Sequence, residues 1–123
     1  MALYRILQST DWSFLIGAEV TQIAIGFHQV QVALFKNRID TTISMETDFI
    51  HERSGQVLSE ATSTPDRAAT LVTLIGKQIE NVRADGENAL FISFSGSETL
   101  KIMVDDEPYE DFTIDGPAGL LVV

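Results

Sequence analysis

The chain has 123 residues, which corresponds to a single domain that can bury a stable core. It contains no cysteine, which excludes disulfide bonds, thiolate zinc sites and a cysteine nucleophile. Its 18 acidic and 8 basic residues give a formal net charge of −10. This charge disfavours nucleic acid and anionic membranes as partners, because both are bound through Lys and Arg.

The N-terminal residues carry no basic stretch followed by an apolar run, so no secretion signal is expected there. No apolar stretch approaches the ~20 residues that a membrane-spanning helix needs. The expected location is therefore the cytoplasm.

Two segments with a similar ending predict helical turns. Residues 10–17 and residues 70–76 both place apolar residues at helical spacing, and both end in Leu-Ile-Gly, at Gly17 and Gly76. Glycine is favoured at a helix end where the backbone turns left-handed.

The second of these segments also has a helix start. Thr64 can cap a helix, Pro65 suits its first turn and Asp66 suits its positive end. A covering helix is therefore predicted over residues 65–75.

Alternating apolar and polar residues follow each glycine and predict antiparallel strands. The predicted strands cover residues 19–25, 30–34 and 39–45 in the first half and residues 78–84, 90–94 and 100–104 in the second. Two further strands are expected at residues 109–114 and 120–123, and residues 55–64 are polar enough to form the loop that joins the halves.

These elements predict an α+β domain with two similar halves, at about residues 10–54 and 64–123, offset by about sixty residues. Each half holds a helical turn and a three-stranded meander with one apolar face that must be covered. The two sheets are expected to pack together or to curl into a barrel, with the predicted helix over one side. Homo-oligomerisation through an exposed strand edge stays open.

Three motifs resemble a family of small uncharacterised bacterial proteins. They are Leu15-Ile16-Gly17, Ile25-Gly26-Phe27-His28-Gln29-Val30-Gln31 and Tyr109-Glu110-Asp111-Phe112-Thr113-Ile114. The resemblance covers most of the chain from Phe14 to Val123, and it departs at Ala33 and Phe35-Lys36-Asn37, where a turn with an aromatic and then an acidic residue is typical. It implies an intact domain of bacterial origin, and no catalytic residue can be carried over from it.

Residues 46–52 contain a candidate metal or acid–base site. If the preceding strand continues, Glu46 and Asp48 point to one face, and a turn can bring His51 near them. Two carboxylates and an imidazole can hold a divalent metal ion or transfer protons. The alternative, which the sequence favours, is a strand that leaves the sheet with solvated acidic residues.

The strongest charge cluster lies near the C-terminus and consists of Asp105, Asp106, Glu107, Glu110 and Asp111. The run lacks the glycine and the alternating ligands of a calcium loop, and its proline indicates a sharp turn. Such a cluster is either a solvated turn or a contact surface that attracts a cationic partner.

Motifs of catalysis are missing from the sequence, which has no nucleophile elbow, phosphate-binding loop or dinucleotide fingerprint. No cofactor is expected. The sequence therefore favours a non-catalytic module that binds a basic protein, for example a bacterial immunity protein that neutralises a cationic toxin. A small-ligand or metal-binding barrel with weak hydrolase activity stays open as the alternative.

Overall fold

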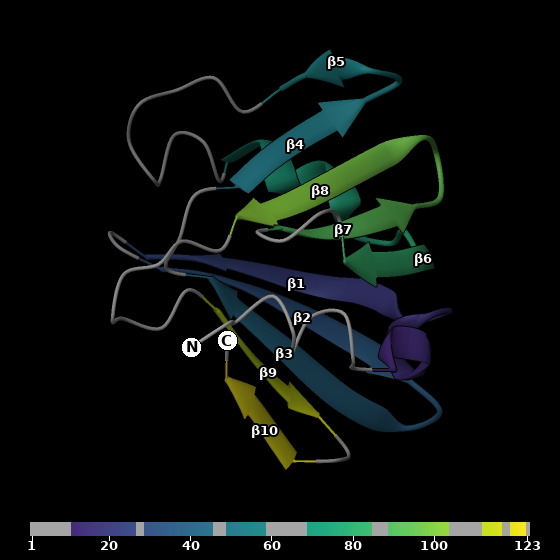
Figure 1. Ribbon diagram of the computed structural model, residues 1–123, viewed down its shortest axis with the longest axis vertical. Coiled ribbons are helices and arrows are strands. Elements are labelled where there is room, and N and C mark those ends of the chain that lie inside the picture. Colours follow the sequence, from purple (N-terminus) through teal and green to yellow (C-terminus); the bar gives the residue numbers. More distant parts are fainter. Residues whose placement is uncertain are drawn as a thin grey trace.

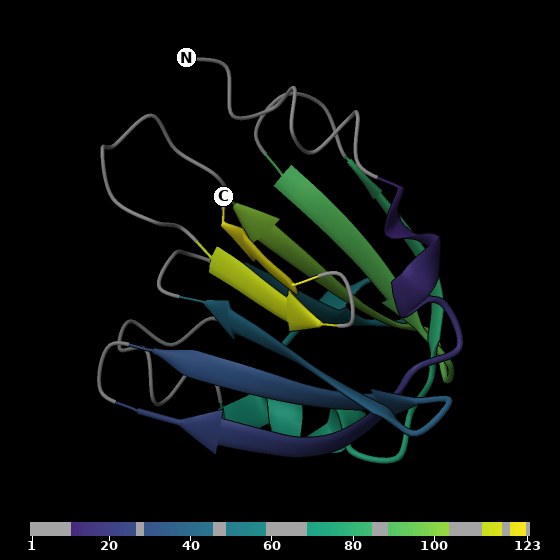
Figure 2. The same cartoon turned by 90° about the horizontal axis from the view of Figure 1, so that it is seen from below.

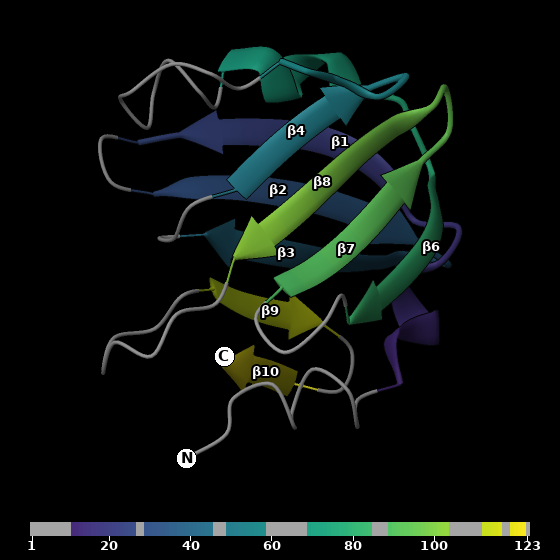
Figure 3. The same cartoon turned by 45° about the horizontal axis from the view of Figure 1, so that its top comes forward.

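The computed structural model describes residues 11–26, 29–45, 49–58, 69–84 and 89–103 with their side chains, and residues 112–116 and 119–122 as backbone. Within these residues the protein consists of two antiparallel β-sheets that pack face to face (Figure 1). The strands of one sheet cross those of the other at an angle, as Figure 3 shows.

The strand Gln56–Val57 lies inside the loop predicted at residues 55–64, so we place the boundary between the halves after residue 58. Each half then contributes five strands within the described residues. The first half supplies β1 (Glu19–Ile25), β2 (Val30–Lys36), β3 (Ile39–Met45), β4 (Phe49–Arg53) and β5 (Gln56–Val57). The second half supplies β6 (Ile79–Ala84), β7 (Ala89–Phe94), β8 (Glu98–Met103), β9 (Phe112–Gly116) and β10 (Gly119–Val122). The first three strands of each half lie close to their predicted ranges, except that β8 begins at Glu98 and not at residue 100.

The predicted α+β class is wrong. The segments expected to form helical turns are short 3-10 helices, η1 (Trp12–Leu15) and η2 (Ala69–Leu74), and the described residues contain no α-helix. The covering helix expected over residues 65–75 is therefore not formed over residues 69–75, while Thr64, Pro65 and Asp66 lie outside the described residues. Among the described elements, no helix is long and apolar enough to cross a membrane.

The spacing of buried residues explains this error. η1 buries Trp12 and Leu15, and η2 buries Leu71 and Leu74. A spacing of three residues fits the three residues per turn of a 3-10 helix as well as it fits an α-helix. Segments this short cannot support an α-helix on their own, because helix nucleation is costly.

Each half supplies strands to both sheets. The first sheet has the order β1-β2-β3-β9-β10, and the second has the order β5-β4-β8-β7-β6. The hairpin β9–β10 of the second half therefore extends the sheet of β1–β3, and the hairpin β4–β5 of the first half extends the sheet of β6–β8. Neither half forms a sheet of its own.

Backbone hydrogen bonds join the two sheets in an approximately two-fold arrangement. The amide of Gly17 donates to the carbonyl of Ile79 at 2.7 Å, and the amide of Gly76 donates to the carbonyl of Val20 at 2.8 Å. The same chain spacing separates both glycines and both acceptors. Four further residues complete the contact, as a β-bridge and its flanking hydrogen bonds: Ala18, Glu19, Lys77 and Gln78.

The hydrophobic core fills the space between the two layers, which Figure 2 shows from below. Inward-facing residues of both sheets meet there, because successive side chains of a strand point to opposite faces. The largest fully buried side chains come from both sheets and both 3-10 helices: Leu15, Leu34, Ile43, Met45, Leu71, Leu74, Ile79, Leu90, Ile92 and Phe94.

Candidate functional site

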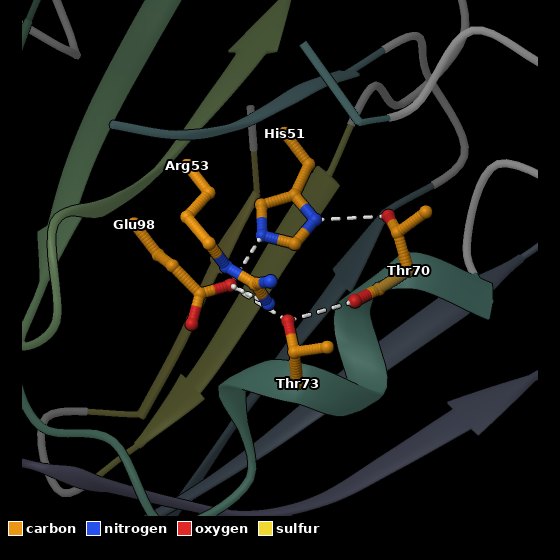
Figure 4. A network of polar contacts seen from close by, with 5 residues as sticks. All are labelled: His51, Arg53, Thr70, Thr73 and Glu98. Carbon is orange, nitrogen blue, oxygen red and sulfur yellow. Dashed lines mark hydrogen bonds and ion pairs between the residues drawn. The ribbon is translucent and has the colours of Figure 1, made fainter. Parts of the chain in front are cut away.

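A polar network lies among the apolar residues of the second sheet. His51 on β4 and Glu98 on β8 are buried, with 0% and 2% of their surface exposed. Thr70 and Thr73 approach them from η2, and Arg53 approaches from the end of β4 (Figure 4). The network therefore connects two strands and a 3-10 helix.

One carboxylate oxygen of Glu98 is the centre of this network. Its Oε1 lies 2.9 Å from Nε2 of His51, 2.6 Å from the hydroxyl of Thr73 and 3.4 Å from Nη2 of Arg53. On the other side of the ring, Oγ1 of Thr70 lies 2.9 Å from Nδ1 of His51. Because a carboxylate only accepts hydrogen bonds, Nε2 of His51 carries the proton and Nδ1 accepts from Thr70.

Burial and hydrogen bonding set the charge of both central groups. Burial lowers the pKa of His51 below its usual value of 6.5, and the hydrogen bond to Glu98 and its charge offset this effect only in part. Burial acts to raise the pKa of Glu98, but hydrogen bonds from Thr73 and His51 and the charge of Arg53 outweigh it, so that this pKa lies below its usual value of 4.5. At neutral pH the network therefore holds a neutral imidazole and a charged carboxylate.

The geometry of His51 favours a linking role over a catalytic one. Its side chain is fully buried, and both ring nitrogens are hydrogen-bonded within the protein. A general base must come within hydrogen-bond reach of a substrate proton. The exposed members of the network are Arg53 and Thr73, and both direct their polar groups to Glu98.

The position of Glu98 has an uncharged counterpart in the other sheet. In the first sheet, Thr41 of β3 pairs with Leu34 of β2. In the second sheet, Glu98 of β8 pairs with Phe94 of β7. Leu34 and Phe94 pair with equivalent residues of β1 and β6, so Thr41 and Glu98 occupy equivalent positions. Thr41 is also buried, with 7% of its surface exposed. The fold therefore does not require a charge at this position.

The position of His51 has a counterpart as well. Ile114 pairs with Ile43 in the first sheet, as His51 pairs with Leu100 in the second. The sequence thus places an aliphatic residue at the backbone position that corresponds to the histidine. The polar network occupies one of two equivalent places in the fold.

The candidate metal site, which the sequence left as the less favoured alternative, is only partly within the described residues. Glu46 and Asp48 lie outside them, and His51 is turned to Thr70 and Glu98. Among the residues that the structure describes, no group of three or more His, Asp or Glu side chains is arranged to hold a metal ion. A metal site at Glu46, Asp48 and His51 stays the less favoured alternative.

The predicted partner-binding residues Asp105, Asp106, Glu107, Glu110 and Asp111 also lie outside the described residues. The strands that flank them are described: β8 ends at Met103 and β9 begins at Phe112. Phe112 pairs with Met45, the last residue of β3, and Met103 pairs with Ala89, the first residue of β7. The cluster therefore connects two strand ends at the edge of the molecule where β3 and β8 end.

We call this edge the crossover end and define it by the strand ends Ile25, Met45, Phe49, Ala84 and Met103. Four connections join strands there, at residues 26–29, 46–48, 85–88 and 104–111. Their sequences contain nine of the 18 acidic residues and no Lys or Arg. The nine are Glu46, Asp48, Asp85, Glu87, Asp105, Asp106, Glu107, Glu110 and Asp111.

The connections at the opposite ends of the strands have a different composition. The links at residues 37–38, 54–55, 95–97 and 117–118 contain no acidic residue and one basic residue, Arg38. The chain therefore concentrates negative charge in the connections of one end.

Sequence reasoning missed most of the polar network, although one signal was present. Glu98 stands in the same alternation phase as Leu100 and Ile102, which are buried. His51 stands likewise in phase with the buried Phe49. A charged or polar residue in the apolar phase of a strand is a signal for a buried polar pair.

Comparisons of the chain with models of protein families, with curated proteins and with solved structures find no match. The resemblance to small bacterial proteins therefore stays a prediction, and the candidate sites rest on the residues themselves.

Proposed function

We propose that this protein is a non-catalytic binding module that engages a basic protein through the acidic residues of its crossover end. The observation that carries the proposal is the placement of charge. Half of the acidic residues, without any Lys or Arg, belong to the four connections of this end.

The physical reason is electrostatic attraction. A surface with one sign of charge raises the local concentration of an oppositely charged partner and speeds its association. A partner that presents Lys and Arg side chains fits these carboxylates, whereas a phosphate backbone or an anionic membrane is repelled by them. An immunity protein that neutralises a cationic toxin, such as a nuclease, is one concrete form of this function.

The test compares charge reversal at the two ends of the molecule. The immobilised full-length chain is incubated with lysate of the organism that encodes it, at low salt, and then washed at high salt. One variant carries Asp105→Lys, Asp106→Lys, Glu110→Lys and Asp111→Lys. A matched variant carries the same number of Lys substitutions outside the crossover end, at Glu19, Asp40, Glu52 and Glu80.

A basic protein held by the wild type and the matched variant, lost from the crossover-end variant and released by salt supports the proposal. Equal retention by both variants, or equal loss, contradicts it, because the two differ only in where the charge is changed. Circular dichroism confirms that each variant is folded.

A further inference from the structure

The polar network is shared between the two halves of the chain. His51 and Arg53 belong to the first half, whereas Thr70, Thr73 and Glu98 belong to the second. The contacts of His51 with Thr70 and Glu98, and the contact of Arg53 with Glu98, all join one half to the other.

The backbone contacts between the halves are self-complementary. The hydrogen bond from Gly17 to Ile79 runs from the first half to the second, and the hydrogen bond from Gly76 to Val20 runs from the second half to the first. Gly76 is the equivalent of Gly17, and Val20 is the equivalent of Ile79. The exchange of hairpins is reciprocal in the same way. Two copies of the same half can therefore form these backbone contacts with each other, as in an isologous dimer. The backbone contacts alone therefore do not determine whether a half pairs with the other half (an unlike pair) or with a second copy of itself (a like pair).

We propose that the network of His51 and Glu98 makes this selection. It directs the first half of the chain to pair with the second half, and it disfavours assemblies in which equal halves of two copies pair. The partner that each half selects is thus the unlike half, recognised through a buried imidazole–carboxylate pair.

In a pair of two second halves, Glu98 loses both partners that come from the first half. The hairpin β9–β10 places Ile114 at the register position of His51, and Asp115 and Gly116 follow it in the chain where Glu52 and Arg53 follow His51. The carboxylate is then buried with no imidazole and no guanidinium. A buried charge without a partner strongly destabilises a protein.

In a pair of two first halves, His51 meets Thr41 at the position of Glu98. Phe14 stands at the position of Thr73, since Phe14 and Thr73 have the same chain spacing as Gly17 and Gly76. The proton on Nε2 of His51 then has a neutral hydroxyl in place of a carboxylate. By the same chain spacing, Asp11 stands at the position of Thr70, so a carboxylate faces the other ring nitrogen of His51. The selection against like pairs therefore rests on the pair of two second halves, in which Glu98 is buried without its partners.

The experiment begins with the full-length chain. A recognition sequence for a site-specific protease is inserted between Leu58 and Ala69, and the folded protein is cut there. The cut protein is unfolded, refolded with both halves together, and analysed by native mass spectrometry, which separates the three kinds of pair by mass. We expect unlike pairs to exceed like pairs at least about tenfold, since an unpaired buried charge costs more than the 1.4 kcal/mol of that ratio.

Two variants then test the residues. His51→Leu with Glu98→Leu removes the network, and we expect like pairs to rise to the proportion of random pairing. Thr41→Glu with Ile114→His adds the network at the equivalent place, and we expect like pairs to rise with the original network intact. Thr42→Glu, on the opposite face of β3, is the control and leaves the selection unchanged.

Random pairing in the wild type overturns the proposal. The proposal is also overturned if the variant Thr41→Glu with Ile114→His forms only pairs of a first half with a second half. This variant keeps the original pair, and it decides the matter if the variant without the network does not refold.

Discussion

Gly17 and Gly76 adopt the same left-handed backbone conformation, with φ of +88° in both, and each donates its amide hydrogen to the opposite half of the chain. Each glycine follows a 3-10 helix and precedes an edge strand. The two positions are therefore equivalent structural joints.

Replacement of either glycine by alanine should destabilise the fold through backbone strain. An added Cβ at Gly76 meets nothing within 4 Å, and at Gly17 its nearest neighbour is Cε of Lys36 at 3.9 Å. The cost is thus that of a left-handed alanine, about 1–2 kcal/mol at each position. Urea unfolding measures it. Asparagine tolerates this conformation better, so Gly76→Asn should cost less than Gly76→Ala, and an equal cost would contradict a strain mechanism.

The two central residues of the polar network should be strongly coupled. His51→Leu leaves the charged Glu98 buried without its imidazole and should cost about 3 kcal/mol or more. Glu98→Leu leaves the proton on Nε2 of the neutral imidazole unsatisfied and should cost about 1–3 kcal/mol. The double variant should cost clearly less than the sum, by about 1–3 kcal/mol. Urea unfolding of the four proteins measures this cycle.

The control for the cycle is Thr41→Val. It removes a buried neutral hydroxyl from the equivalent position of the first sheet and should cost no more than about 1 kcal/mol. Additive costs for His51→Leu and Glu98→Leu would show that the two residues act independently.

Stability should fall in two stages as the pH is lowered. The pKa of His51 is lower in the folded protein than its usual 6.5, so the unfolded chain binds more protons below pH 6.5. The contribution of His51 to the free energy of unfolding is therefore complete above pH 6.5 and is lost as the pH falls toward the lowered pKa of His51. The pKa of Glu98 is also lowered, from 4.5, so a second stage is lost below pH 4.5.

Thermal unfolding between pH 8 and pH 3 measures both stages. His51→Gln, which cannot titrate, should remove the stage that begins near pH 6.5 and keep the one below pH 4.5. A wild-type Tm that is constant between pH 7 and pH 5 would contradict the buried neutral state of His51.

Salt should stabilise the protein because the connections of the crossover end carry acidic residues without bases. Repulsion among them is screened as NaCl is added. We expect a gain of about 1 kcal/mol, or a rise in Tm of roughly 4 °C, between low salt and 0.5 M NaCl (about 4 Å screening length).

Neutralised variants show where this salt effect arises. Asp105→Asn, Asp106→Asn, Glu110→Gln and Asp111→Asn together should remove most of the rise in Tm. The same number of neutral substitutions at Glu19, Asp40, Glu52 and Glu80 should leave most of it. The opposite order would place the repulsion elsewhere in the molecule.

The second and third strands of each half were predictable because they alternate between buried and exposed residues, as Val30, Val32 and Leu34 do in β2. The alternation of the first strands, β1 and β6, is broken by a register shift near the start of each strand. The helix type was not predictable, because Leu71 and Leu74 are spaced for either kind of helix. The exchange of the hairpins β4–β5 and β9–β10 between the two sheets was not predictable either. The alternation of β4 fixes which side chains face inward, and it says nothing about which sheet the strand joins.

The network depended on long-range pairing. His51 and Glu98 are 47 residues apart in the chain, and only the placement of β4 beside β8 brings them together. In the sequence, the acidic residues near His51 are Glu46 and Asp48, whereas in the structure the imidazole binds Glu98 of the neighbouring strand. The charge asymmetry was visible in composition, but its concentration at one end required the sheet topology.

An NMR titration of the uniformly labelled protein with a decalysine peptide tests the role of the crossover end most directly. If this end is the surface that attracts cations, shifts at low salt should concentrate at Gly26, Met45, Ala89 and Met103 and vanish at high salt. Shifts concentrated instead at the opposite hairpins, at Asn37, Gly55 and Gly96, would contradict the account.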